Sequence, residues 1–449
     1  MKPYSLPVEL TCSPDELTGG ITMTLVKKYL AKHQAMMQRY TYLDSMYEGF
    51  HSIYLAPEKP NWKPDNRLAF NYPRYLTETF LGYAYGIPIK ETHPDDAINE
   101  KLQEFQRSNE LTDHEYELFQ TVCIYGHGFE YLYQDEQAQT KMTVCTPQEL
   151  VVVYDDTVKH KALFAVRYGY RDSKGHKIIY GEVLTPDEII PFDGEKLQEP
   201  LLNPYGRIPV VEYIMNRQRI GLYEHVCCLI EAYNRTASEK QNDIEAFAEA
   251  YLKVIGVELT EQQIKQMRDN RVINLEGEDA AEKALAEFMT KPSADETQEN
   301  LLNRLDDQIY QMSMVANISD ETFGSATSGV ALAYKLQAMS NLALGFDRKI
   351  EKSLRKRYKL WSSLKTNVSD PDCWKDIDIQ TTRNLPQNRL EEAQTAAQLS
   401  GIVSRETQLS LLSIVPDPKA ELEKMEAEEE EGTGSLITWN GHEEEPDEQ

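Results

Sequence analysis

Cysteine and histidine are scarce in this sequence, and neither falls into a metal-binding pattern. Six cysteines and nine histidines occur in 449 residues. No C-x-x-C pair and no H-E-x-x-H motif is present, so the spacing does not favour a metal site. We therefore expect no metal, no cofactor and a reducing compartment. His127, between Gly126 and Gly128, is interpreted as a turn residue rather than a ligand.

Long apolar runs are missing as well. The longest, such as residues 150–154 and 162–166, are far shorter than the roughly 20 apolar residues that span a bilayer. The first residues, MKPYSLPVELTC, lack the charged and then apolar profile of a signal peptide. These absences predict a soluble protein with no membrane segment and no export by the usual route.

Positive charge is in short supply. The 74 acidic residues outnumber the 47 basic residues and give a formal net charge of -27. Tight binding to nucleic acid depends largely on neutralising phosphates, so this balance argues against it. It does not argue against proximity to nucleic acid, because an acidic wall repels a polyanion and keeps it from adhering, as a conduit requires.

Motifs for catalysis are absent too. Gly324 and Gly329 have the spacing that opens a phosphate-binding loop, but the next two residues are Val330 and Ala331 instead of Lys and Ser or Thr. The sequence also lacks a paired-acid, nucleophile or metal motif. A hydrolase is therefore disfavoured, and we expect that the chain is not an enzyme.

The most informative feature that is present is a polar loop between two long helical patterns. Its glycines permit backbone conformations closed to other residues, and its small hydroxyl side chains let it lie close to another large surface. We predict a mobile or partner-facing loop, with a plain connector between helices as the alternative. The residues expected to face a partner are Asn317, Ser319, Asp320, Thr322, Phe323, Gly324, Ser325, Thr327, Ser328 and Gly329.

The first 216 residues predict a domain of mixed helices and strands. Helical patterns come first, with ends at Gly49 and Gly126, and Ser13 is expected to cap a first helix. Segments rich in β-branched and aromatic residues, separated by turn-forming residues, then predict an antiparallel sheet. These segments are residues 129–133, 142–145, 150–154, 162–170 and 177–183.

The next part of the chain predicts an antiparallel helix pair that carries a compact tip. Residues 222–255 have an apolar stripe at helical spacing, and residues 297–318 have another. Between them lies a small α/β insertion, with strands expected at 271–275 and 285–289 and a capping box from Thr260 to Gln263. The charged face of the first helix includes Glu231, Arg235, Glu239, Lys240 and Asp243.

Residues 330–364 predict one long helix with a bend at 341–345. Its second half has a basic edge at helical spacing, formed by Arg348, Lys352, Arg355 and Lys359. These cations either stay solvated near the helix carboxyl end or contact acidic neighbours or passing phosphate. A strand at 376–380 and helices at 385–400, 404–412 and 419–431 follow, before an acidic tail that is expected to be disordered.

Several blocks of this sequence, taken in order, resemble the portal proteins of tailed bacteriophages, specifically the SPP1-like family. The resemblance covers roughly residues 20 to 365. The blocks are Tyr47 to Ile53 (YEGFHSI), Asn71-x-Pro73, Tyr85 to Pro88 (YGIP), Ile124 to Glu130 (IYGHGFE), Asn203 to Pro209 (NPYGRIP), Leu229 to Asn234 (LIEAYN) with Asn242-Asp243, and Ser328 to Ala331 (SGVA).

This resemblance implies an α+β, helix-rich portal fold with a mixed α/β wing, a two-helix stem, a small α/β clip, a long kinked helix and a helical crown. The implied regions are a wing at 1–216 with a return strand at 367–384, stem helices at 217–254 and 297–318, a clip at 255–296, the tunnel loop and long helix at 319–366, crown helices at 385–431 and an acidic tail at 432–449.

The resemblance also implies a dodecameric ring at one capsid vertex of the virion, assembled in the host cytoplasm. Double-stranded DNA would pass through it non-specifically, pumped in by the terminase large subunit. Further implied partners are a head-completion or adaptor protein and the major capsid and scaffolding proteins. We expect the charged stem residues to pair between neighbouring copies. The alternative is a structural adaptor or connector ring that does not itself conduct packaging.

Overall fold

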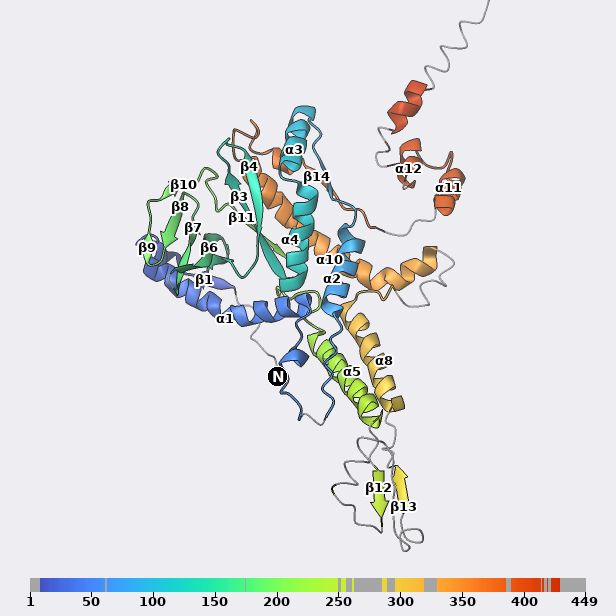
Figure 1. Cartoon of the computed structure of the whole chain (residues 1–449). Coiled ribbons are helices and arrows are strands. Elements are labelled where there is room, and N and C mark those ends of the chain that lie inside the picture. Colours follow the sequence, from blue (N-terminus) through green and yellow to red (C-terminus); the bar gives the residue numbers. More distant parts are fainter. Residues whose placement is uncertain are drawn as a thin grey trace, which may run out of the picture. The chain divides into compact units, whose positions relative to one another are not determined.

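The structure is a computed structural model that describes residues 9–60, 63–173, 175–248, 252–255, 261, 285–288, 295–318, 329–384, 389–412, 414–415, 418 and 421–428. The chain divides into two units, one of Met1–Ser325 with Ala333–Arg383, and the other of Ala326–Leu332 with Asn384–Gln449. The first unit contains all the sheets among the described residues and most of the long helices (Figure 1).

The predicted strand segments pair antiparallel wherever they pair with each other, but the larger sheet of the first unit is mixed and not antiparallel throughout. Strands β5 to β8 form an antiparallel meander, but β1 adds to β5 in parallel, with Leu10 opposite Val153. No local turn marks this pairing, because β1 comes from the distant amino-terminal segment. The strands are β1 (Leu10–Cys12), β5 (Leu150–Asp155), β6 (Ala162–Ser173), β7 (His176–Leu184), β8 (Glu188–Asp193), β9 (Lys196–Leu197) and β10 (Leu201–Leu202).

The first two predicted strands belong to a separate antiparallel sheet. This sheet has the order β11-β3-β4. A turn in which the Glu149 amide donates to the Thr146 carbonyl redirects the chain after β4, so β4 does not pair with β5. The strands are β3 (His127–Gln134), β4 (Thr140–Cys145) and β11 (Val210–Ile214).

Helix α1 (Met23–Glu48) packs its apolar face on the larger sheet. Val26 and Tyr29 are fully buried there, and the Tyr29 ring meets Phe164 edge-on at 5.5 Å. The helix ends at Gly49, as predicted, with a left-handed φ of 91°. The helix predicted after Ser13 is only a 3-10 turn, η1 (Pro14–Leu17), and the Ser13 side chain forms no capping bond.

An aromatic core joins four helices. Phe346 lies 6.0 Å from Phe80 and 6.3 Å from Phe119, and Phe105 lies 5.5 Å from Trp361, measured between ring centroids. The helices are α2 (Tyr72–Tyr85), α3 (Asp96–Ser108), α4 (Leu111–Tyr125) and α10 (Gly329–Trp361). Beside them, β14 (Asp378–Gln380) returns from the far end of the chain and pairs with β2 (Lys90–Thr92).

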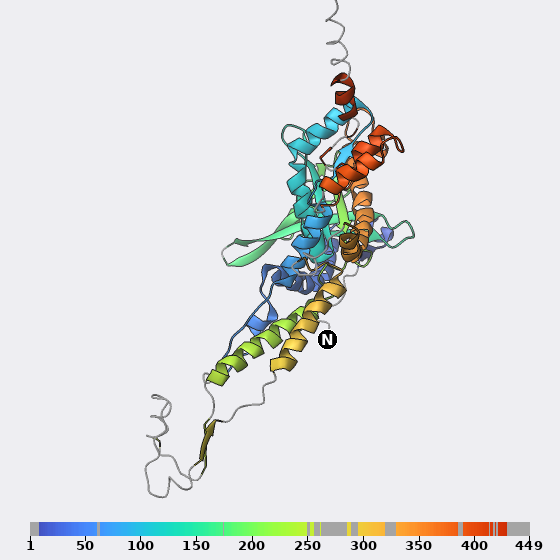
Figure 2. The ribbon, with the colours of Figure 1, turned by 90° about the vertical axis from the view of Figure 1, so that its right-hand side faces the viewer.

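The predicted helix pair is present as α5 (Cys227–Ala248) and α8 (Asp295–Ser313), which run side by side in Figures 1 and 2. The predicted bounds are too wide. Residues before Cys227 form turns, because the Leu222 amide donates to the Cys123 carbonyl and is held against the end of α4. Residues Leu252–Ile255 form strand β12, which pairs with β13 (Leu285–Phe288), rather than the last turn of a helix. Helix α8 ends at Ser313, where Met314 adopts a φ of 61°.

The remaining predictions meet the structure only in part. Helix α10 is continuous through residues 341–345, and the bend expected there stays a prediction. The second unit contains α11 (Arg389–Gln398) and α12 (Arg405–Ser410), which Ser404 caps by accepting from the Thr407 amide. The strand at 271–275, the capping box from Thr260 to Gln263 and the tail at 432–449 lie outside the described residues. Among the helices that are described, none is long and apolar enough to cross a membrane.

Candidate functional site: the helix pair, its attachment and the long helix

A short extended segment, residues 66–70, lies along α5 and is bound to it by a ladder of hydrogen bonds. We call this segment the strap. The Asn66 amide donates to Asn242 Oδ1 at 2.7 Å, and the Phe70 amide donates to Asn234 Oδ1 at 2.9 Å. Between them, the Leu68 amide donates to Ser238 Oγ at 2.9 Å. Alternate strap residues therefore meet every fourth residue of the helix.

The ladder works because two repeat lengths agree. Four residues of an α-helix advance about 6 Å, and two residues of extended chain advance about 6.6 Å. Polar side chains spaced four residues apart on α5 can therefore accept hydrogen bonds from every second amide of the strap, the amides that face the helix. Asn234, Ser238 and Asn242 are all buried, so the acceptor end of each bond lies away from water.

A cluster of aromatic rings fastens both helices of the pair to α2. Tyr72 of α2 meets Tyr233 of α5 at 5.3 Å and Tyr310 of α8 at 6.1 Å, both edge-on. The Tyr72 hydroxyl also donates to Asp306 Oδ1 at 2.5 Å. Burial, together with Asp306, raises the pKa of Tyr72 well above its usual value, so this phenol stays a donor at any physiological pH. One tyrosine thus holds α5 and α8 at the same place.

The charged residues predicted to pair between copies have partners within the chain, with one exception. Glu239 accepts from Lys59 Nζ at 2.9 Å, Asp243 accepts from Gln298 at 3.1 Å, and Lys240 pairs with Glu299 of α8. Glu231 accepts from the Tyr42 hydroxyl at 3.1 Å. Arg235 is exposed and forms no ion pair with a described residue. Pairing between copies therefore stays a prediction, and Arg235 is the member best placed for it.

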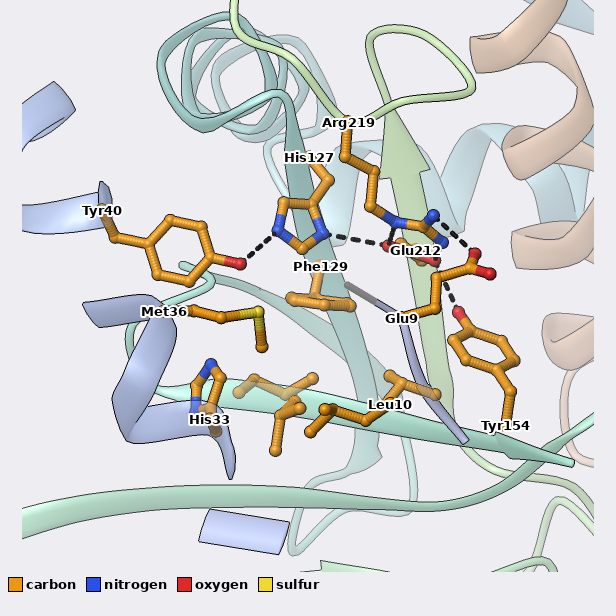
Figure 3. A pocket seen from close by; sticks show the side chains of 13 residues that line it. Glu9, Leu10, His33, Met36, Tyr40, His127, Phe129, Tyr154, Glu212 and Arg219 are labelled. Carbon is orange, nitrogen blue, oxygen red and sulfur yellow. Dashed lines mark hydrogen bonds and ion pairs between the residues drawn. The ribbon is translucent and has the colours of Figure 1, made fainter. Parts of the chain in front are cut away.

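The chain enters α5 through a buried ionic joint (Figure 3). Arg219 donates from Nε and Nη2 to the two oxygens of Glu212 at 2.6 and 2.8 Å, and its Nη1 lies 2.5 Å from Glu9. His127 bridges Glu212 and the Tyr40 hydroxyl, at 2.9 Å on each side. Burial alone would raise the pKa of Glu212, but the bonds from Arg219 and His127 hold it well below its usual range. The joint is therefore charged and fully paired.

The joint also requires glycine at position 126, where the backbone passes close to the backbone of Arg219. Gly126 has a φ of 84°, and a Cβ there would lie 2.2 Å from the Arg219 carbonyl oxygen. The space left among the side chains of Figure 3 is about 30 Å³, which is room for water but not for a substrate. His127 begins β3 in a hydrogen-bonded position instead of occupying a turn, so its interpretation as a turn residue is wrong. Within the part of the chain that is described, no three His, Cys, Asp or Glu side chains are grouped as metal ligands.

The structure places only the edges of the predicted partner-facing loop. Asn317 and the exposed Ile318 follow the end of α8, and Gly329 is the first residue of α10. The other loop residues of that prediction, Ser319, Asp320, Thr322, Phe323, Gly324, Ser325, Thr327 and Ser328, lie outside the described residues.

The basic edge of α10 contains two kinds of cation. Arg355 pairs with Glu351 one turn away at 2.9 Å, and Lys359 Nζ lies 5.0 Å from the centroid of the Trp374 ring. Arg348 and Lys352 are exposed, and neither forms an ion pair with any residue in the described ranges. The edge therefore has two cations that are available to a partner.

Sequence reasoning missed the cation that matters most for the fold. Arg357, on the opposite face of α10, is 0% exposed. Its Nε and Nη2 donate to Glu130 of β3 at distances of 2.7 to 3.1 Å, and its Nη1 pairs with Glu115 of α4. Nη1 also lies 3.9 Å from Glu91 of β2. A single acid in the apolar run around Glu130 is the one signal in the sequence that could have indicated a buried partner.

The three buried acids around Arg357 differ in protonation. Burial would raise the pKa of Glu130, but Arg357 and His114 lower it to about 2. Burial raises the pKa of Glu115 despite its pairing with Arg357. Burial and the neighbouring charge of Glu115 raise the pKa of Glu91 to about 8, so Glu91 is mostly a neutral acid at pH 7. One guanidinium therefore does not have to balance three carboxylates.

Glu91 makes the stability of the fold depend on pH. Because its pKa is about 8 in the folded chain and about 4.5 when unfolded, the native state holds an extra proton between these values. The contribution of Glu91 to the free energy of unfolding is therefore complete below pH 4.5. It declines as pH rises towards 8, by up to about 1.4 kcal/mol per pH unit. We expect Glu91→Gln, which stays neutral, to lose less stability than the native chain between pH 6 and 8. Urea unfolding at several pH values measures this, and parallel slopes for the two proteins would contradict it.

Comparisons with known proteins agree on one family. The family model described as phage portal protein, SPP1 Gp6-like, matches residues 26–435. The portal protein of Bacillus phage SPP1 is 24% identical, over 93% of this chain and 84% of the relative. The portal protein of Clostridium phage phiCD119 is also 24% identical, over 85% of this chain and 88% of the relative.

Among solved structures, the chain is similar to a chain in the neck of a native GTA particle, with a TM-score of 0.44 and 12% identity over 76% of this chain and 89% of the other. A chain in the neck of an empty GTA particle gives a TM-score of 0.40 and 14% identity over 80% of this chain and 97% of the other.

The match over most of the sequence defines the class of protein as a structural, non-enzymatic component of the virion. Within that class, the chain belongs to the SPP1 Gp6-like family of phage portal proteins. The predictions of the family and of a non-enzymatic role are therefore confirmed.

Proposed function

We propose that copies of this chain close into a ring at one capsid vertex and that double-stranded DNA passes through the ring during packaging and exit. The observation that carries this proposal is the helix pair. Helices α5 and α8 are both fastened to α2 at one end, the strap runs along α5, and at the other end the two helices lead to the two-stranded tip β12–β13. Such a helix pair can pack beside the helix pairs of identical copies around a rotation axis.

The regions of the chain would divide the work of a portal. The sheets and the helices around them, with β14, form the wing, and α5 and α8 form the stem. The tip at 255–296 is the clip, which would dock the terminase large subunit first and a head-completion or adaptor protein afterwards. The loop before α10 is the tunnel loop, and the helices after residue 385 form a crown. Scaffolding and major capsid proteins would contact the wing.

The dimensions of a twelve-membered ring support this proposal. Twelve stem helices side by side at about 10 Å place their axes on a circle of about 120 Å circumference and about 38 Å diameter. Removing about 10 Å for the helix bodies leaves a bore of about 28 Å, which admits a DNA duplex. The tunnel loop, with Ser, Thr and Asn, would touch phosphates without holding them or reading bases.

The first experiment concerns the ring itself. We expect the purified chain to reach a mass of about twelve copies in light scattering, and to appear as rings with a central opening in negative-stain images. A chain that stays monomeric under assembly conditions, and also forms no ring in virions, would rule the proposal out.

Deleting Gly324 to Ser328 from the tunnel loop separates a DNA channel from the alternative, a connector ring that never handles DNA. These residues connect α8 to α10 and carry no part of the described core, so we expect rings to form normally. We expect DNA packaging into procapsids to fall by at least about tenfold. The matched control deletes residues of the same number from the acidic tail after residue 431. Normal packaging by the loop deletion would favour the connector ring.

A further inference from the structure

We propose that Arg348 and Lys352 of α10 dock on Asp113 and Glu117 of α4 in a second copy of this chain. This inference rests on the proposed ring and names the surfaces through which the bodies of two neighbouring copies would recognise each other. It gives a role to the two cations of the basic edge that have no ion-pair partner among the described residues of their own chain.

Within one copy, α4 and α10 face each other through the buried pair of Glu115 and Arg357. An α-helix turns about 100° per residue, so residues on either helix can be placed relative to this pair. On α4, Asp113 and Glu117 are each two residues from Glu115, about 200° around the helix. They therefore point away from α10.

The same calculation applies to α10. Arg348 precedes Arg357 by nine residues, which is about 180° after whole turns are removed. Lys352 precedes it by five residues, about 140° around the helix. Both cations therefore point away from α4. With the Glu115–Arg357 pair between the two helices, the acidic pair lies on the outer side of α4 and the basic pair lies on the outer side of α10.

All four side chains are available. Asp113, Glu117, Arg348 and Lys352 are exposed, and none of them has an ion pair within the ranges that the structure describes. The two acids are four residues apart, and so are the two cations. Each pair therefore spans about 6 Å along its helix, so both contacts can form at once when the helices of two copies lie side by side.

A recess beside Asp113 gives the contact a shape as well as a charge. It has a volume of about 340 Å³ and lies between the first turns of α4 and the chain that leaves α2. Its lining includes Thr112, Asp113 and Tyr116 and, deeper on the side that faces α10, Tyr85, Glu115 and Phe119. A long cationic side chain from the neighbouring copy can lie over a tyrosine ring there and still reach the carboxylate.

The placement of the two surfaces suits a closed ring. Figure 1 shows α4 in front of the second half of α10, and the turned view of Figure 2 separates them to left and right. A ring requires two different, complementary surfaces on opposite faces of each copy, because its contacts run head to tail. The acidic pair and the basic pair meet that requirement. Exposed pairs of this kind contribute mainly to register and choice of partner.

Charge reversal in the full chain tests the contact. We expect Arg348→Glu with Lys352→Glu, and separately Asp113→Lys with Glu117→Lys, to raise the concentration needed for half-maximal ring assembly by about tenfold. The variant with all four reversals should assemble within about threefold of the native chain, because opposite charges face each other again. Light scattering across a concentration series measures all three.

The matched control is Asp96→Lys with Glu100→Lys on α3, an exposed acidic pair at the same spacing and also in the first turns of a helix. It should assemble like the native chain. Double reversals that leave assembly unchanged, or a fourfold reversal no better than the double ones, would overturn the contact while leaving the ring itself intact. Loss of DNA packaging by Arg348→Glu with Lys352→Glu in rings that assemble normally would instead assign the basic edge to DNA and would also overturn it. Failure of the native chain to form rings would count against the proposed function.

Discussion

Replacing Arg357 with methionine is expected to destabilise the fold by about 3–5 kcal/mol. Methionine replaces the stem of the side chain with an unbranched apolar chain but removes the guanidinium that pairs with Glu130 and Glu115. Those carboxylates are buried, and removing one partner of a buried ion pair leaves the other charge without compensation. The loss should be measured as the free energy of unfolding in urea, at pH 7.

A control two residues away makes this test specific. Arg355→Met removes the same charge from the same helix, but Arg355 is only half-buried and its partner Glu351 is exposed. We expect a change within about 0.5 kcal/mol, because surface ion pairs contribute little. The loss in Arg357→Met should also shrink at low pH, where Glu115 and Glu130 take up protons. Equal effects of the two substitutions would contradict the assignment of Arg357 as the central cation of the fold.

Replacing Asn234, Ser238 and Asn242 together with alanine is expected to release the strap from α5. Three backbone amides of the strap would lose their buried acceptors, and each unsatisfied amide costs about 1–3 kcal/mol unless the strap moves out into water. We therefore expect amide hydrogen exchange at Asn66, Leu68 and Phe70 to accelerate by at least about a hundredfold, since each 1.4 kcal/mol of lost protection is a factor of ten. Hydrogen-exchange mass spectrometry measures this.

Thr236 provides the control for the strap. It lies on the same helix, but its hydroxyl donates to the Ala232 carbonyl of its own helix at 3.0 Å. Thr236→Ala should leave the exchange of the strap amides within about threefold of the native rate. If the triple variant also exchanges at the native rate, the strap is held by apolar packing and not by the ladder. In the proposed ring, the triple variant should show a less ordered α5, because the strap would no longer fix this helix to the rest of the first unit.

Local patterns in the sequence were sufficient to predict where the long helices and most strand segments lie. Apolar residues at helical spacing indicated α5, α8 and α10, and glycine ended α1 and α4 where predicted. The bounds of α5 were wrong because contacts from elsewhere in the chain decide them. Leu222 is held by Cys123, and Leu252–Ile255 pairs with a strand that begins thirty residues after Ile255. A helical period cannot reveal that such a partner exists.

By itself, the sequence determined the family, the absence of catalytic motifs, and the order of helix pair, tip, loop and long helix, because each depends on residue type and spacing along one stretch of chain. Only the tertiary structure decided which charged side chains of α10 are exposed and which are buried in ion pairs. Arg348 and Arg357 look alike in the sequence, yet one is exposed and the other is sealed among three acids. The physical reason is that burial and pairing depend on what α10 packs against, and β3, β2 and α4 reach it from segments more than 200 residues earlier.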